Sequence, residues 1–199
     1  IVFFHFQVLE YFPPAMNLLL DLSEAFPESA IRVYSFKDLK ASKFSPGRPN
    51  IKILRYGVSS SKANILIRLF EYLKFHLFSL IDSIFFHPSI IIYFDTVSSL
   101  IPFILKTYLI RSARLLVHFN EYEDPSQTNS GQLMRYFPSS CQRYLFRKAE
   151  WVSHTNEYRL DLFLKDNSNI EIVNPGVLRN FPPKNWINQI SLNSGPAKY

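Results

Sequence analysis

Short apolar segments alternate with stretches of helical periodicity along the chain, and this alternation limits the possible folds more than any other feature. Seven segments are continuous, mainly apolar runs bounded by turn residues, which is typical of buried strands. They are Ile1–Phe6, Ile31–Phe36, Ile51–Tyr56, Ser89–Phe94, Arg114–His118, Trp151–His154 and Ile170–Val173. Strands that are apolar on both sides predict a parallel sheet covered by helices on both faces.

Helical patterns fill the intervals between these strands. The expected helices are Pro14–Phe26, Lys62–Ser83, Val97–Ile110, Gln132–Lys148 and Asn156–Asp166. Pro13 and Pro14 favour the start of the first helix, Thr96 is placed to cap the third, and Pro138 is expected to interrupt the fourth. Because crossovers between parallel strands are right-handed, we predict an α/β protein with a Rossmann-like, doubly wound parallel sheet and helices on both faces.

Glycine and cysteine are scarce, which excludes several kinds of site. The 199 residues include 5 Gly and 1 Cys, Cys141, so a disulfide framework and a cysteine-based zinc site are excluded. The loop Gln7–Pro14 lacks the glycines of a dinucleotide-binding fingerprint, so Asp38 is interpreted as a surface carboxylate rather than a ribose ligand. Neither a P-loop nor a nucleophile elbow occurs. The acidic segment 121–124 could hold a divalent cation, but such a loop is more often only solvated, and we expect no metal.

Positive charge is concentrated in one part of the chain. The net charge is +6, yet residues 1–30 contain four acidic residues and no Lys or Arg, whereas residues 31–74 contain ten Lys or Arg and two acidic residues. A basic block of this kind is either a solvated face or a surface for lipid headgroups, nucleic acid or acidic sugars. Nucleic acid is not expected as a partner, because no helix clusters Arg and no nucleic-acid motif is present.

Candidate site residues follow the ends of the expected strands, because ligands of such sheets bind outside the carboxyl ends of the strands. Polar residues stand there at Gln7, Asp95, His118, Glu121 and 155–158. A neutral His can exchange a proton near pH 7 or hydrogen-bond a sugar hydroxyl, so His118, followed by Glu121, is the most suggestive. The plainer interpretation is a strand-end His satisfied by a neighbouring carbonyl group. Thr155 or Asn156 is expected to cap the helix that follows.

These stretches, in this order, resemble the N-terminal half of a GT-B glycosyltransferase, in particular the large retaining family of nucleotide-sugar glycosyltransferases, family four. The motifs are a strand like Ser89–Phe94, a strand ending in His118 with Glu121 soon after, and a pattern Arg-x-Ala-Asp-x-Val-x-x-x-Ser/Thr. Residues 147–155 follow this pattern with Glu150 for Asp and with Thr155 one position early. The turn Asn174–Val177 and Phe181-Pro182-Pro183 complete the likeness, which covers nearly the whole chain. The chain departs from the family in the loop after the first strand, where Pro13-Pro14-Ala15 replaces a Gly-Gly pair.

The resemblance implies a retaining, metal-free transfer of a sugar from a nucleotide-sugar donor to a glycan or lipid-linked acceptor, with no cofactor. His118 matches the catalytic position near the donor sugar, and Asp95, Glu121 and Tyr122 are expected to bind the acceptor. Residues 1–181 would form the N-terminal domain, and 182–199 a linker and the start of a missing C-terminal domain that carries the Glu-x7-Glu element and binds most of the donor. Both ends look cut, and the chain alone is expected to be inactive. The alternative is a non-catalytic Rossmann-like module that binds an anionic partner.

The resemblance also implies a cytoplasmic enzyme of polysaccharide or glycolipid assembly that can lie on the inner face of an anionic membrane. The basic block and the aromatic-rich segment Lys62–Phe86 fit this role. We favour the simpler interpretation that the wide apolar face of this helix is core against the sheet. Charged residues interrupt the segment, so it is not expected to span a membrane.

Overall fold

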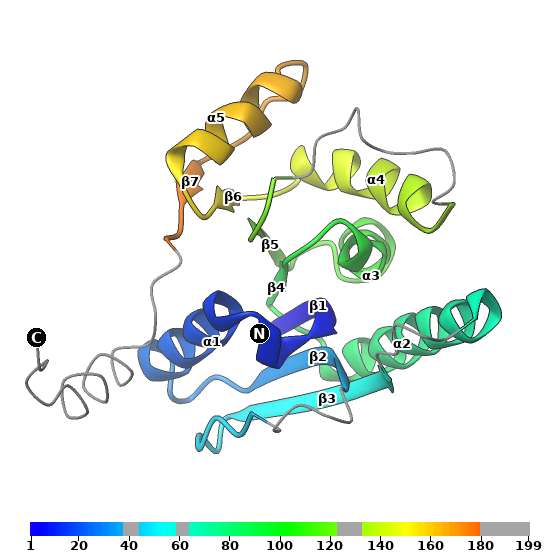
Figure 1. The fold of residues 1–199 in the computed structure, drawn as a ribbon. Helices are drawn as coiled ribbons and strands as arrows, with labels where there is room; N and C mark the ends of the chain where they lie inside the picture. Colours follow the sequence, from blue (N-terminus) through cyan, green and yellow to red (C-terminus); the bar gives the residue numbers. More distant parts are fainter. Residues whose placement is uncertain (38–43, 59–63, 123–132, 180–199) are drawn as a thin grey trace, which may run out of the picture.

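The computed structural model describes residues 1–37, 44–58, 64–122 and 133–179, and it confirms the predicted fold class. Seven parallel strands form one sheet in the order β3-β2-β1-β4-β5-β6-β7 (Figure 1). The strands are β1 (Val2–Val8), β2 (Ile31–Lys37), β3 (Ile51–Val58), β4 (Ile90–Tyr93), β5 (Arg114–Phe119), β6 (Trp151–His154) and β7 (Pro175–Val177). The order reverses between β1 and β4, and ligands of open α/β sheets bind at the carboxyl edge beside such a reversal.

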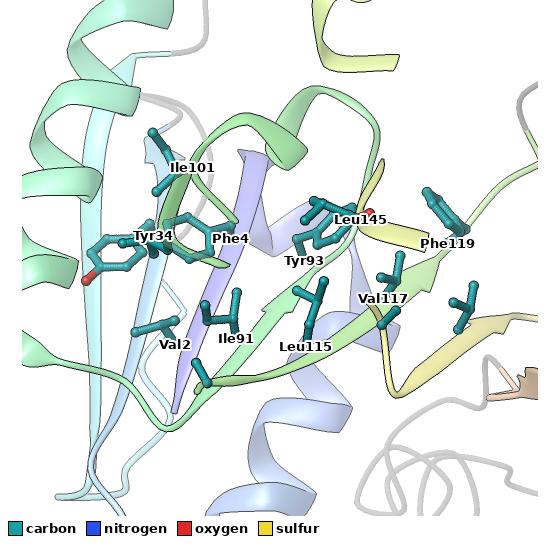
Figure 2. Close-up of a cluster of buried hydrophobic side chains, with 14 of the residues drawn as sticks. Val2, Phe4, Tyr34, Ile91, Tyr93, Ile101, Leu115, Val117, Phe119 and Leu145 are labelled. Atoms are coloured by element: carbon teal, nitrogen blue, oxygen red, sulfur yellow. The ribbon is translucent and has the colours of Figure 1, made fainter. Parts of the chain in front are cut away.

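Helices cover both faces of this sheet. Helix α1 (Pro13–Ala25) packs on one face through Ala15 and Leu19, against Phe3, Val33 and Phe94 among others. The opposite face meets α2 (Ile65–Phe86), α3 (Leu100–Ile104), α4 (Leu133–Phe146) and α5 (Glu157–Asp166). The larger core cluster lies between these helices and the sheet, where strand side chains such as Val2, Ile91, Leu115 and Val117 form a continuous row (Figure 2).

The third expected helix is divided into three short pieces. A 3₁₀ turn, η2 (Val97–Ser99), leads into α3, and a π-helical turn, η3 (Leu105–Leu109), follows it. Pro102 offers no N–H to this stretch, which favours a change of helical geometry. Thr96 does not cap the helix as expected, because Asp95 does so: its Oδ1 accepts from the Ser98 N–H at 2.7 Å, and its Oδ2 from the Ser98 hydroxyl at 2.9 Å.

Two other expectations about secondary structure are wrong. Helix α4 runs through Pro138 without interruption. The last strand is not Ile170–Val173 but β7, which pairs with β6 in the register Ser153 to Gly176. Ile170 instead closes the end of α5 as a buried core residue. Gly176 suits its strand position, because an added Cβ would lie 2.7 Å from Nε1 of Trp151.

The prediction that the wide apolar face of the long second helix packs in the core against the sheet is also wrong. The face of α2 that meets the sheet carries Tyr72, Phe75, His76, Ser79 and Ser83, all buried. The opposite side of the same helix consists mainly of exposed Leu, Ile and Phe. Within the described residues, no helix is long and apolar enough to cross a membrane.

Candidate functional site

The centre of the carboxyl edge brings together two buried histidines and one half-buried aspartate from three neighbouring strands. His5 of β1, Asp95 just after β4 and His118 of β5 lie side by side in the sheet order. Phe94 lies between the two imidazoles. Its ring centroid is 5.6 Å from that of His5 and 5.9 Å from that of His118, and both contacts are edge to face. At this edge His5, Asp95 and His118 thus follow one another along the sheet, with His118 at one end of the group.

His118 is fully buried and is held by the neighbouring strand. Its Nδ1 lies 2.8 Å from the hydroxyl of Ser153, its partner in the β5–β6 register. Its Nε2 and the Oδ1 of Asn120 are buried, and neither makes a hydrogen bond of good geometry within the described structure. Burial lowers the pKa of His118 to about 4, and the side chain of Asn120 acts in the opposite direction. At neutral pH His118 is therefore a neutral hydrogen-bonding group and not a cation.

The pairing with Ser153 differs from the plainer sequence interpretation, in which a carbonyl group would satisfy the ring. Ser153 Oγ also lies 3.4 Å from the carbonyl oxygen of Val117. When the hydroxyl donates to that carbonyl, Nδ1–H of His118 donates to Oγ and the lone pair is on Nε2. Nδ1 is thus used to orient the ring, and Nε2 is buried on the side of the Asn120 side chain.

His5 was not expected from the sequence, although a single imidazole inside the apolar run Val2–Phe6 is a visible signal. The residue is 1% exposed, and its Nδ1 lies 3.5 Å from Oδ2 of Asp95. Phe12, at the start of α1, packs edge-on against the ring at 4.5 Å. Since Asp95 already accepts two hydrogen bonds from Ser98, its carboxylate is fixed in place beside His5.

The other two residues expected to bind an acceptor lie farther from this cluster. Glu121 is exposed, and Tyr122 is half-buried with its hydroxyl directed to Asp166 at the end of α5. Asn120, which precedes Glu121, is held by two hydrogen bonds. Its carbonyl oxygen accepts from Arg159 Nη1 at 2.5 Å and from Thr155 Oγ1 at 3.2 Å. Glu123 and Asp124 of the acidic segment lie outside the described residues, as do Asp38 and the expected linker 182–199.

Residues 155–158 form the start of α5 and do not present a vacant helix terminus. Asn156 caps the helix as expected, because its Oδ1 accepts from the Arg159 N–H at 2.8 Å. Glu157 is exposed and pairs with Arg179 at 2.6 Å. The N-terminus of α5 is therefore satisfied by its own chain, which leaves little for an anion to neutralise.

His154 lies on the other face of the sheet and belongs to the core. Its ring stacks on Phe119 at 5.1 Å and packs on Phe163 at 4.9 Å. Burial, with smaller contributions from His118 and Arg159, lowers its pKa to about 4. The two histidines of the segment 118–154 thus differ in environment, and only His118 faces the cluster with His5 and Asp95.

The loop after β1, where the family has its Gly-Gly pair, is built without glycine. It forms the 3₁₀ turn η1 (Leu9–Tyr11), whose Glu10 accepts from Arg55 at 2.5 Å and from the backbone N–H of Phe44 at 3.0 Å. Gln7 is exposed, and its carbonyl oxygen accepts from the hydroxyl of Ser35 at 2.8 Å. Contacts of the Glu10 and Ser35 side chains therefore hold this glycine-free loop in place.

No group of three or more His, Cys, Asp or Glu side chains within the described ranges could hold a metal ion. His5 and Asp95 form only a pair, and Cys141 is buried in α4. The chemistry that the described part of the chain supports is hydrogen bonding and proton exchange by an imidazole and a carboxylate.

Comparison with solved structures supports the fold. The chain is similar to a sucrose-phosphate synthase from Thermosynechococcus elongatus, with a TM-score of 0.58 and 10% sequence identity. The similarity covers 96% of this chain and 52% of that protein, so the chain spans about half the length of its structural neighbour. No family model matches the sequence, and no curated protein matches it. At 10% identity the likeness shows the Rossmann-like fold, seen here as one seven-stranded unit.

Proposed function

We propose that this chain is the acceptor-side half of a retaining, family-four-like glycosyltransferase that moves a sugar from a nucleotide-sugar donor to a glycan or lipid-linked acceptor. The observation that carries the proposal is the buried His118 at the carboxyl edge, with Nδ1 held by Ser153 and Nε2 unpaired in the described structure. The likeness of this sheet to half of a sucrose-phosphate synthase, a GT-B glycosyltransferase, supports the same assignment. The sequence motifs around residues 118, 150 and 174–177 supply the third support.

His118 is the proposed catalytic residue. A neutral imidazole that is fixed at Nδ1 offers Nε2 at a defined position, where it can hydrogen-bond a hydroxyl of the donor sugar near the reacting carbon. Because the ring is buried, this hydrogen bond forms in a medium of low polarity and is stronger than the same bond in water. The second domain would bring the nucleotide and the remaining charged groups, and no metal is needed in the proposed reaction.

Asp95, Glu121 and Tyr122 are proposed to contact the acceptor. Asp95 is fixed by Ser98 and lies beside His5, so it can accept a hydrogen bond from an acceptor hydroxyl without reorganising. Glu121 is the most exposed of the three and suits the rim of an acceptor site. Tyr122 contributes mainly by holding the segment after β5 against α5 through Asp166.

The test is donor turnover by the natural polypeptide that carries this sequence. Release of nucleoside diphosphate is measured with UDP-glucose, UDP-N-acetylglucosamine and GDP-mannose, for the wild type, His118→Asn and the control His87→Asn, whose imidazole is exposed after α2. We expect one donor to be consumed, and we expect His118→Asn to lower kcat/KM by about 10²–10⁴-fold. Binding of an anionic ligand without any turnover would instead support the alternative, a non-catalytic module.

A further inference from the structure

Helix α2 presents its apolar side to the solvent and not to the sheet. The side that packs on the sheet includes two buried serines and a buried histidine, and Ser79 donates to the Phe75 carbonyl oxygen at 2.6 Å. The other side, which we call the outer face of α2, carries ten large apolar residues that are all exposed. They are Leu66, Ile67, Leu69, Phe70, Leu73, Leu77, Phe78, Ile81, Ile84 and Phe85. Soluble monomers rarely expose a contiguous apolar patch of this extent, so the outer face is a contact surface.

Apolar residues on this side of the helix follow a heptad spacing. Six of them recur at alternating intervals of four and three residues along α2, and we call this row the seam. They are Leu66, Phe70, Leu73, Leu77, Leu80 and Ile84. All are exposed except Leu80, which is half-buried. A repeat of 3.5 residues is the pattern along which one helix packs on another. The spacing therefore indicates a helix as the occupant of the outer face.

The charged residues of α2 lie beside the seam and not on it. Arg68 is on the side that faces the sheet, one turn before the first buried residue of that side. Asp82 accepts from Arg32 at 2.6 Å, and Glu71 pairs with Lys74 at 3.7 Å. A helix that binds a bilayer has basic residues along its polar side, whereas these pairs neutralise charge within the chain. The seam is thus complementary to another uncharged apolar helix.

The exposed apolar area is sufficient for a dimer. Phe85 is 84% exposed, Leu66 72% and Phe70 63%. With on the order of 200 Å² for a fully exposed side chain of this size, the exposed fractions of the outer face correspond to roughly 1,000 Å² on one chain. A stable interface between two proteins buries about 800 Å² on each partner. The outer face can therefore supply the whole of one copy's share.

We propose that the outer face of α2 is the interface of a homodimer, in which the seams of two copies pack against each other across a two-fold axis. Such an interface must be complementary to itself, and an uncharged apolar face meets this condition. The apolar surface also continues beyond the helix, because Phe78 stacks on Tyr56 of the edge strand β3 with 5.5 Å between the ring centroids. An obligate dimer interface has this apolar character.

The proposed interface is separate from the candidate site. Figure 1 shows α2 beside β2 and β3 at one side of the molecule, away from β5, which carries His118. Three strands, β2, β1 and β4, lie between β3 and β5 in the sheet. Two copies that meet at α2 therefore each keep their own carboxyl edge for ligands, and the dimer does not depend on sugar transfer.

The test is the oligomeric state of the natural polypeptide that carries this sequence. It is measured by sedimentation equilibrium from roughly 0.5 to 50 µM, a range that brackets micromolar dissociation constants. The variant Leu77→Lys, Ile84→Lys places a charge at two seam positions, which are 55% and 43% exposed. Its matched control is Phe26→Lys, Val173→Lys, at positions that are 49% and 46% exposed after α1 and before β7.

Two further variants separate the seam from a general effect of charge or folding. Leu77→Met, Ile84→Leu keeps the seam apolar and close to its original volume. Leu73→Gln, a single substitution, introduces a polar side chain without charge and with good helix propensity. Far-UV circular dichroism of each variant checks that the helical content is retained.

We expect the wild type to sediment as a dimer. The Leu77/Ile84 lysine variant should have a dissociation constant raised roughly 100-fold or more, because its dimer would bury four unpaired ammonium groups. Leu73→Gln should raise the constant about tenfold, since each dimer would bury two unpaired amide groups. The Phe26/Val173 control and the Met/Leu variant should remain dimers with the constant of the wild type.

A wild type that stays monomeric over this range would overturn the proposal, and so would a dimer that the seam variants and their control form equally well. Aggregates without a defined mass would also contradict it, because a two-fold interface closes. Binding of a monomeric wild type to vesicles of phosphatidylcholine and phosphatidylglycerol, weakened by Leu73→Gln, would assign the outer face to a bilayer instead. Sedimentation needs no sugar donor. Failure of the dimer would therefore leave the proposed function unaffected, and absence of turnover would leave the dimer unaffected.

Discussion

His118 on β5 and Ser153 on β6 lie opposite each other in the strand register, with 2.8 Å between Nδ1 and Oγ. Both side chains are fully buried, so water does not compete for this hydrogen bond. The contact explains how a strand-end imidazole can be held in one orientation through Nδ1. The motif Trp151–His154 therefore contributes to the site through Ser153 and not through its own histidine.

Ser153→Ala should destabilise the fold, because it leaves Nδ1 of a buried imidazole without its partner. We expect a loss of about 1–3 kcal/mol in the free energy of unfolding, measured by urea titration at pH 7. Ser112→Ala, an exposed serine before β5, serves as the control and should change stability by less than about 0.5 kcal/mol. Equal stability of the two variants would show that the hydrogen bond contributes nothing.

Stability should fall as the pH is lowered from about 6.5 toward 4. Burial lowers the pKa of His118 to about 4, that of His154 to about 4 and that of His76 to about 3. In this window the unfolded chain binds protons at these histidines and the native state does not, so acid favours unfolding. Each histidine contributes up to about 1.4 kcal/mol per pH unit to the slope.

The check is urea unfolding at several pH values for the wild type and for His76→Phe, which replaces an imidazole packed among Phe6, Tyr72 and Phe75. Between pH 6 and 5, the free energy of unfolding should change less steeply with pH in the variant than in the wild type, by the contribution of about one bound proton. An unchanged slope would contradict the assignment of His76 as a buried neutral group.

Gly176→Ala tests the position of β7. Its new Cβ would lie 2.7 Å from the Trp151 indole nitrogen, so the strand or the ring must shift, at a cost of about 1–3 kcal/mol. Thermal unfolding of Gly176→Ala, alone and combined with Trp151→Leu, measures this cost. Partial rescue in the double variant is expected. A stability loss that the second substitution does not reduce would argue against the contact.

His87→Gly should stabilise the protein. His87 ends α2 with φ of 51°, a left-handed conformation that costs little for Gly and more for any other residue. We expect a gain of about 0.5–1 kcal/mol in thermal unfolding. Asn174→Gly provides the contrast, because Asn174 has φ of 49° but its side chain also donates to the Glu150 carbonyl oxygen at 3.1 Å. A loss of stability in His87→Gly would mean that its side chain has a role of its own.

The sequence predicted the alternation of strands and helices well, because each strand is a continuous apolar run and each helix has the matching period. It failed where tertiary contacts decide. Ile170 lies in an apolar run that is typical of a strand, yet its side chain closes the end of α5, and the strand forms at Pro175–Val177 beside Trp151. Residues as unfavourable to strands as Pro and Gly become strand residues there because β6 offers an unpaired edge.

The candidate site could be predicted only in part, because strand pairing decides which strand ends lie next to each other. His118 and Asp95 could be selected because strand ends in a parallel sheet meet at one edge. His5 could not be paired with Asp95 until β1 was known to lie beside β4. Periodicity also identified the wide apolar side of α2, but it could not tell which side meets the sheet, since small Ser79 and Ser83 allow close packing as well as large residues do.

The central claim is that Nε2 of His118 faces the substrate, and its most direct test is the ring-nitrogen NMR spectrum of the natural polypeptide labelled with ¹⁵N-histidine. Resonances are assigned with His118→Asn and His76→Phe, and UDP-glucose, UDP-N-acetylglucosamine and GDP-mannose are added in turn. The account predicts that the nucleotide sugar that is turned over shifts the His118 Nε2 resonance and leaves that of His76 in place. Turnover of a donor with no change at His118 would contradict it.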